Sequence, residues 1–255
     1  MITVSGLSIT AVKGTRVRAV DAIELGERGA RGDRAFYLID ARGQMVNGKR
    51  WGELQAIVAD FDPDGRTLAL ALPDGTTASG AIAHAGPVQT TFFSRPREAQ
   101  ELRGPWSEAL SAFFGEPLRL VEVPSAVDRG RKAAVSLISR ASLRRLAQSA
   151  TCDTVDDRRF RMTIEVEGVD AHAEDSWIGE RVRIGAALVR FRGNIGRCMV
   201  TTRNPDTGAV DLQTLHALAD YRRHVDSSEP LPFGIYGEVL AGGTVRVGDP
   251  VEPIF

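Results

Sequence analysis

The sequence predicts a mostly β protein with a few short helices, an α+β chain built around barrel-like sheets. Short apolar or alternating runs follow one another closely through the first 95 residues and return in the last third of the chain. Turn residues separate them, as at 62–65 and 73–75, where proline presets φ and glycine accepts a positive φ. Short strands spaced this closely favour a barrel or sandwich over βαβ units.

The N-terminal part is expected to be rich in strands and to end in one helix. The apolar or alternating runs that we interpret as strands lie at residues 2–12, 18–25, 35–40, 54–61 and 67–72. A helix is expected over 105–114, because Trp106, Leu110 and Phe113 share one face. Residues 124–132 are polar and charged. We interpret them as a linker that divides the chain into domains 1–123 and 124–255.

The C-terminal part mixes strands with two helices. Helices are expected over 141–149, where Ser139 is the candidate N-cap, and over 212–225. The remaining apolar runs, which we interpret as strands, lie at residues 133–138, 160–166, 181–184, 187–191, 235–240 and 243–251.

Composition narrows the class of protein. A chain of 255 residues can bury a sizeable core, and a net charge of -1 gives no reason to expect nucleic acid or a membrane surface as a partner. The first residues lack the basic start and apolar stretch of a signal peptide, and no apolar run approaches the length of a membrane span. We therefore expect the protein in the cytoplasm.

Cys198 is the residue that most clearly points to chemistry. It follows a predicted strand in the loop Gly196-Arg197-Cys198, and a neighbouring arginine favours the thiolate, which is both a nucleophile and a soft metal ligand. From the residues alone, a buried structural cysteine remains the alternative. No histidine has a context that suggests a Cys-His hydrolase, and the paired ligand spacing of a zinc site is absent. Cys152, beside Asp153, is interpreted as structural.

Several short motifs follow one another along the chain in an order that is informative as a set. In the C-terminal part they are Arg159-Phe160-Arg161, Ala173-Glu174-Asp175-Ser176-Trp177, Gly196-Arg197-Cys198, Asn204-Pro205-Asp206-Thr207-Gly208 and Val247-Gly248-Asp249-Pro250-Val251. In order and spacing they resemble the MOSC family. Residues 32–40 and 43–46 resemble the β-barrel domain that precedes MOSC in the amidoxime-reducing component family. The resemblance implies an N-terminal MOSC-type β-barrel domain packed on a MOSC β-barrel.

The same resemblance implies a molybdenum cofactor, which is a pterin with a dithiolene and a terminal phosphate. Cys198 would be the protein ligand of the metal and the catalytic residue. The positions that match cofactor-contacting residues of the family are Lys13, Arg34, Ser139, Arg161, Thr163, Arg197 and Tyr236. Cations from separate segments would bind the phosphate through charge-assisted hydrogen bonds. The alternatives are a solvated charge for Lys13 and Arg34, simple capping for Ser139 and packing for Tyr236.

Three positions depart from the pattern of the family's reductases. Thr163 stands where asparagine is expected, and Gly14 and Gly196 stand where serine is expected. Each lost hydrogen bond is worth about 1 kcal/mol. These changes leave the metal ligand in place. They affect which substrate is expected, and a member of the family that has lost catalysis is the alternative.

The resemblance implies an oxidoreductase that reduces N-hydroxylated or related N–O compounds of low molecular weight. The chain has no Fe–S cysteine set, flavin motif or dinucleotide fingerprint, so the electrons must come from a separate flavoprotein, ferredoxin-like or cytochrome-type protein. The alternative is a carrier that holds persulfide sulfur or the intact cofactor on the same cysteine.

Overall fold

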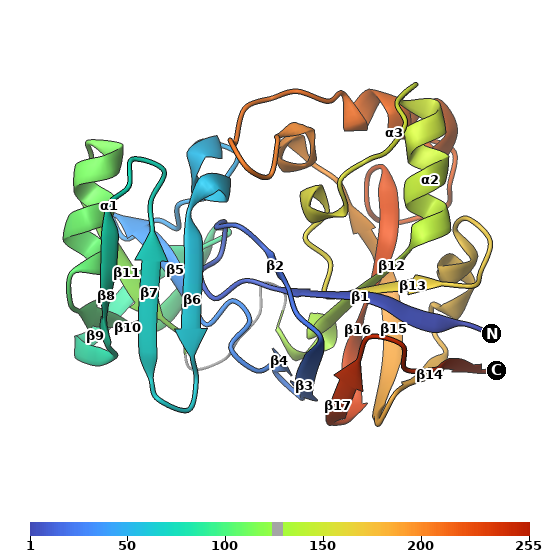
Figure 1. Ribbon diagram of the computed structural model, residues 1–255, viewed down its shortest axis with the longest axis horizontal. Helices are drawn as coiled ribbons and strands as arrows, with labels where there is room; N and C mark the ends of the chain where they lie inside the picture. The colour runs from blue at the N-terminus through green and yellow to red at the C-terminus, as the bar shows by residue number, and fades with distance from the viewer. Residues whose placement is uncertain (124–129) are drawn as a thin grey trace.

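A computed structural model describes residues 1–123 and 130–255 (Figure 1). Two lobes lie side by side, and both chain termini lie at the outer edge of the same lobe. The prediction of a mostly β chain with a few helices is confirmed. Most of the expected linker, together with the expected domain boundary after residue 123, falls outside the described residues. Of the rest, Arg131–Ala133 forms the 3-10 turn η2.

The first lobe, on the left of Figure 1, packs one helix and two small antiparallel sheets around an apolar core. The strand orders are β5-β11-β10-β9 and β6-β7-β8. Helix α1 (Trp106–Phe114) buries Trp106 and Leu110 in that core, and the indole Nε1 of Trp106 donates to the Leu68 carbonyl at 3.1 Å. The strands are β5 (Phe36–Asp40), β6 (Val58–Asp62), β7 (Thr67–Ala71), β8 (Thr77–Ala81), β9 (Ala83–Phe92), β10 (Arg95–Arg103) and β11 (Leu118–Glu122).

The second lobe is built on an eight-stranded sheet in the order β18-β14-β15-β16-β12-β13-β1-β2. Within it β12 and β13 are parallel and the other pairs are antiparallel. The helices α2 (Arg140–Ser149) and α3 (Thr214–Arg222) pack together beside it. The strands are β1 (Thr3–Ile9), β2 (Arg18–Ala19), β12 (Val135–Ser139), β13 (Ile164–Glu167), β14 (Arg181–Ile184), β15 (Ala187–Gly196), β16 (Pro232–Ala241) and β18 (Val251–Ile254).

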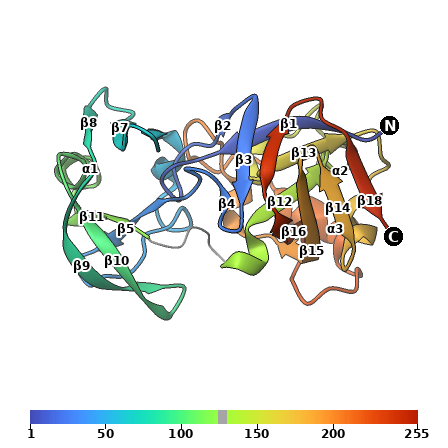
Figure 2. The same ribbon diagram turned by 90° about the horizontal axis from the view of Figure 1, so that it is seen from below.

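The N-terminal residues belong to this second lobe. Strand β1 pairs with β13, and β3 (Ala22–Gly26) pairs with both β4 (Gly29–Ala30) and β17 (Gly243–Arg246). In Figure 2 these strands lie beside the C-terminal strands. Their apolar side chains share one buried cluster with those strands. The chain then crosses to the first lobe at β5. The segment at residues 10–17 joins β1 to β2, and the segment at residues 31–35 connects β4 to β5. The Lys13 amide donates to the Phe36 carbonyl and the Arg34 amide to the Thr10 carbonyl, so Lys13 and Arg34 lie at the seam between the lobes.

The elements expected from the sequence agree best with the structure where one face of the element is buried. All three helices are found within a few residues of their expected bounds, and β14 has the predicted bounds. The strand expected over 54–61 is wrong in its first half, because Gly52–Ala56 forms the 3-10 turn η1. The strands β8 to β11 were not predicted. The hairpin β9-β10 has no apolar alternation to detect, because many of its side chains are exposed and polar. None of the described helices is long and apolar enough to cross a membrane.

His172 is a partly buried titratable residue that packs against Tyr221 of α3. It precedes the 3-10 turn η4 (Ala173–Trp177), and its ring lies 5.6 Å from that of Tyr221 and 5.9 Å from that of Phe233. Burial lowers the pKa of His172 to about 4, and the positive charges of Arg222 and Arg145 add to this effect. Neither ring nitrogen has a hydrogen-bond partner within the described part of the chain.

We expect His172 to make the fold sensitive to acid. The unfolded imidazole takes up its proton near pH 6.5 and the folded one near pH 4, so stability is lost as pH falls through that window. The variant His172→Phe should lose less stability than wild type between pH 6.5 and 4, as measured by urea unfolding at several pH values. His216→Phe, exposed on α3, is the control. Equal pH slopes for His172→Phe and wild type would contradict the assignment.

Candidate functional site

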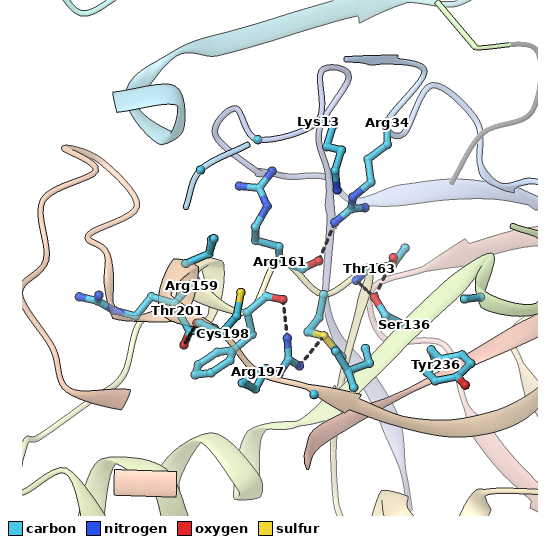
Figure 3. A pocket seen from close by; sticks show the side chains of 18 of the residues that line it. Lys13, Arg34, Ser136, Arg159, Arg161, Thr163, Arg197, Cys198, Thr201 and Tyr236 are labelled. Atoms are coloured by element: carbon cyan, nitrogen blue, oxygen red, sulfur yellow. Dashed lines mark hydrogen bonds between the residues drawn. The ribbon is translucent and has the colours of Figure 1, made fainter. Parts of the chain in front are cut away.

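A cavity of about 460 Å³ lies at the seam, lined by residues of both lobes (Figure 3). This volume is within the range of pockets that hold small molecules and cofactors. Seven of the eight predicted site residues line it: Lys13, Arg34, Arg161, Thr163, Arg197, Cys198 and Tyr236. Segments far apart in sequence therefore converge on one space.

Cationic side chains gather on one side of the cavity. Arg34 Nη2 donates to the backbone carbonyl of Arg161 at 2.8 Å, and Lys13 points toward the same place (Figure 3). The Lys13 ammonium lies 5.1 Å from the centre of the Phe93 ring. Asp33 is the only carboxylate among the described lining residues, and it pairs with the Arg34 guanidinium. The lining on this side thus carries a net positive charge.

The backbone at two of these cations is left-handed. The φ angle is 48° at Arg34 and 56° at Arg161, a conformation that costs a non-glycine residue about 1–2 kcal/mol. Because Arg34 donates to the carbonyl of Arg161, the two strained residues hold each other in place. Strain of this kind concentrates at functional sites, where the surrounding structure fixes it.

Cys198 lies at the start of the 3-10 turn η5 (Met199–Thr202). The amide and the hydroxyl of Thr201 both donate to the Cys198 carbonyl at 3.0 Å, which fixes the backbone that carries the thiol. The thiol is free and partly exposed, and it lines the cavity. No histidine is found among the described lining residues, so the cavity provides no Cys-His pair for hydrolysis.

The side chain of Arg197 forms hydrogen bonds with the backbone of two neighbouring segments. Its Nε donates to the Phe233 carbonyl at 2.8 Å, and its Nη1 donates to the Phe160 carbonyl at 3.1 Å. Its Nη2 contacts the Met162 sulfur at 3.1 Å. These bonds tie the loop before Cys198 to the segment that carries Arg161. The geometry thus supports a positioning role for Arg197, in addition to its place in the lining.

Hydroxyl groups form another part of the wall. Thr163 is 3% exposed, and its amide donates to Ser136 Oγ at 3.0 Å, while the two hydroxyls lie 3.2 Å apart. Ser136 on β12 stands opposite Tyr236 on β16. All three residues line the cavity. Ser136 was not predicted from the sequence, although it lies on the same strand as the predicted Ser139.

Ser139 is placed elsewhere. It caps α2 by accepting a hydrogen bond from the Ser142 amide at 3.1 Å, and its own amide donates to the Glu174 carboxylate at 3.1 Å. It is fully buried and is not among the residues that line the cavity. Residues three apart on a strand point to opposite faces, so Ser136 and Ser139 cannot both face the cavity. The predicted capping is confirmed, and we leave Ser139 out of the proposed cofactor contacts.

Arg159 lines the cavity and was missed as a site residue. It is 7% exposed and binds both carboxylate oxygens of Asp211, at 2.7 and 3.0 Å, which lowers the pKa of that carboxyl. Its Nη1 also donates to the Arg203 carbonyl at 2.8 Å. Its Nε is buried and has no partner within the described part of the chain. The signal in the sequence was the motif Arg159-Phe160-Arg161, in which only Arg161 was assigned a role.

The two unexpected glycines have close neighbours. A Cβ at Gly196 would lie 2.6 Å from Glu229 Oε2 and 3.1 Å from Pro230 Cδ. Gly14 has a φ of +96°, and a Cβ there would lie 3.3 Å from Leu54 Cδ1. Serine fits neither position without movement of its neighbours. The departures at these two positions are therefore part of how this chain packs.

Comparison with known proteins gives matches over nearly the whole chain. Residues 124–252 match the family model of the MOSC domain, and residues 1–117 match that of the MOSC N-terminal beta barrel domain. Mitochondrial amidoxime-reducing component 1 of Xenopus laevis is 28% identical over 97% of this chain and 81% of its own length. The Homo sapiens protein of the same name is 28% identical over 95% of this chain and 79% of its own. Among solved structures, the YUAD protein from Bacillus subtilis is similar with a TM-score of 0.47, at 14% identity, covering 99% of this chain and 96% of that one.

Proposed function

The chain belongs to the MOSC domain family, and from this membership we propose that it binds a molybdenum cofactor at the seam and reduces N-hydroxylated or related N–O compounds. The names of its relatives, amidoxime-reducing components, support this reaction class. The observation that carries the proposal is the convergence, in one cavity, of a free thiol with cations from three separate segments. A pterin with an anionic phosphate and a thiolate-bound metal needs that combination.

The residues present fit the cofactor. A deprotonated sulfur is a soft ligand that suits a metal already held by dithiolene sulfurs. Arginine and lysine side chains bind phosphate through charge-assisted hydrogen bonds, and Asp33 is paired with Arg34. Arg159, which lines the cavity, adds a buried Nε that has no hydrogen-bond partner in residues 1–123 and 130–255. The donor set thus matches both ends of the cofactor.

Each part of the wall has a distinct proposed role. Cys198 ligates the metal, and Lys13, Arg34 and Arg161 bind the phosphate. Thr163 and Tyr236 provide hydroxyl groups for the pterin. When bound, the cofactor supplies two-electron redox chemistry, whereas the chain supplies ligation, anchoring and a shaped pocket. Arg197 fixes the relative position of the thiol and the phosphate-binding segment through the carbonyls that it binds.

The electrons are expected to come from a separate flavoprotein, ferredoxin-like or cytochrome-type protein. Removal of the oxygen of an N–OH group as water consumes two electrons and two protons. Two cysteines cannot hold a four-cysteine cluster, and the sequence has no dinucleotide fingerprint. The protein loaded with cofactor should therefore not reduce benzamidoxime with NADH alone and should turn over with reduced methyl viologen. Turnover with NADH alone would contradict this expectation.

A carrier of persulfide sulfur or of the intact cofactor is the second candidate. The partial exposure of Cys198 favours it, because a carrier needs an accessible cysteine. Failure with every electron donor, despite full molybdenum loading, would favour the carrier over the reductase. The cytoplasmic location and the division into domains 1–123 and 124–255 remain predictions.

A further inference from the structure

One cation of the cavity belongs to none of the groups described above. Only three of the chain's basic residues are lysines, and two of them, Lys13 and Lys49, line the cavity. Lys13 lies beside Arg34 and Arg161, but Lys49 comes from the loop that joins β5 to η1. Lys49 is exposed, and its ammonium forms no ion pair with any residue in 1–123 or 130–255. It is thus a positive charge available to a ligand.

The loop that carries Lys49 has a defined shape. The side-chain oxygen of Asn47 accepts from the Lys49 amide at 3.0 Å. The Asn47 carbonyl accepts from the amides of Arg50 and Trp51 at 3.2 Å. Asn47 and Gly48 line the cavity together with Lys49. The turn therefore presents three consecutive residues to the same space.

This loop rests on the residues that follow Cys198. Arg203 Nη2 donates to the Lys49 carbonyl at 3.1 Å, and a Cβ at Gly48 would lie 3.8 Å from Val200 Cγ2. Val200 is two residues after Cys198 and lines the cavity as well. The backbone of Lys49 is therefore attached to the side of the cavity that carries the thiol, whereas Lys13 and Arg34 are attached to Arg161.

The placement of the charges suggests that different cations bind the cofactor and the substrate. In the proposed function, Lys13, Arg34 and Arg161 bind the cofactor phosphate. The substrate must reach the metal at Cys198. Resting on that function, we propose that Lys49 selects anionic substrates, namely N-hydroxylated compounds that also carry a carboxylate. An exposed, flexible ammonium contributes a modest and salt-sensitive attraction, which corresponds to about a fivefold preference.

Two substrates that differ only in charge test the proposal. The cofactor-loaded protein is assayed with benzamidoxime and 4-carboxybenzamidoxime, with reduced methyl viologen as the electron donor. Wild type should show a lower KM for the carboxylate, and Lys49→Gln should reduce that preference about fivefold. Arg50→Gln is the matched control, because it makes the same charge change in the same loop, and Arg50 binds Glu116 at 2.9 Å. Arg50→Gln should keep the wild-type preference.

A binding measurement separates this proposal from the proposed function. Calorimetric titration of the loaded, resting protein with 4-carboxybenzamidoxime needs no turnover. If neither compound is reduced, the proposed reaction fails, but weaker binding to Lys49→Gln than to Arg50→Gln still supports the role of Lys49. Equal preference in wild type and Lys49→Gln would overturn that role. A loss of pterin in Lys49→Gln would also overturn it, because Lys49 would then belong to the cofactor site.

Discussion

Replacement of Cys198 by serine or alanine is expected to abolish molybdenum-dependent reduction while the fold remains intact. Loss of a group that merely orients a metal ligand typically costs 10–100-fold in activity, so loss of the ligand itself should cost more than about a hundredfold. Cys198 belongs to none of the buried apolar clusters that the described residues form, and its side chain is partly exposed. The free energy of unfolding should therefore change by less than about 0.5 kcal/mol.

The second cysteine provides the matched control. Cys152 packs against the cluster beneath α2, and its sulfur lies 3.4 Å from the Thr154 carbonyl, away from the residues that line the cavity. Cys152→Ala should retain molybdenum and activity at the cost of some stability. The measurements are metal content, reduction of benzamidoxime and urea unfolding. Full activity with bound molybdenum in both Cys198 variants would exclude Cys198 as the ligand.

The sequence was sufficient for those parts of the site that lie in short local motifs. Cys198 and Arg161 were predicted because each lies in a tripeptide that resembles a motif of the MOSC family. Lys13 and Arg34 were predicted singly, and the structure shows why they meet: β1 joins the second lobe, and the chain then crosses the seam to β5. Pairing of the chain's first strand with β13 is a long-range choice that local periodicity does not contain.

The remainder of the wall could not be predicted, for two physical reasons. Ser136 and Ser139 are the same residue type on the same strand. Only the register of β12 decides which of them faces the cavity. Lys49 and Arg159 reach the cavity through loop packing, in which Arg203 bridges segments distant in sequence. Tertiary contacts of this kind leave no periodic signal.

Arg161 allows binding and folding to be separated within one position. Because the φ angle at this position is 56°, glycine is tolerated there without strain. The free energy of unfolding of Arg161→Gly should therefore lie within about 1 kcal/mol of the wild-type value. The same variant removes a cation from the proposed phosphate site, so pterin content after purification should fall. Arg161→Ala should lose the same charge while it retains the strained backbone, and Lys13→Ala should lower pterin content as well.

Reversal of the charge at Arg161 should lower pterin content more than removal of the charge does. Arg161→Glu places a carboxylate beside the proposed phosphate, so repulsion is added to the lost attraction, and pterin content should fall below that of Arg161→Gly. Pterin is measured per mole of protein from a host that makes the cofactor, at two salt concentrations, because a charge effect at a partly exposed site weakens with salt. If Arg161→Gly and Arg161→Glu both retain full pterin at low salt, Arg161 is an ordinary surface charge and its left-handed backbone serves the fold alone.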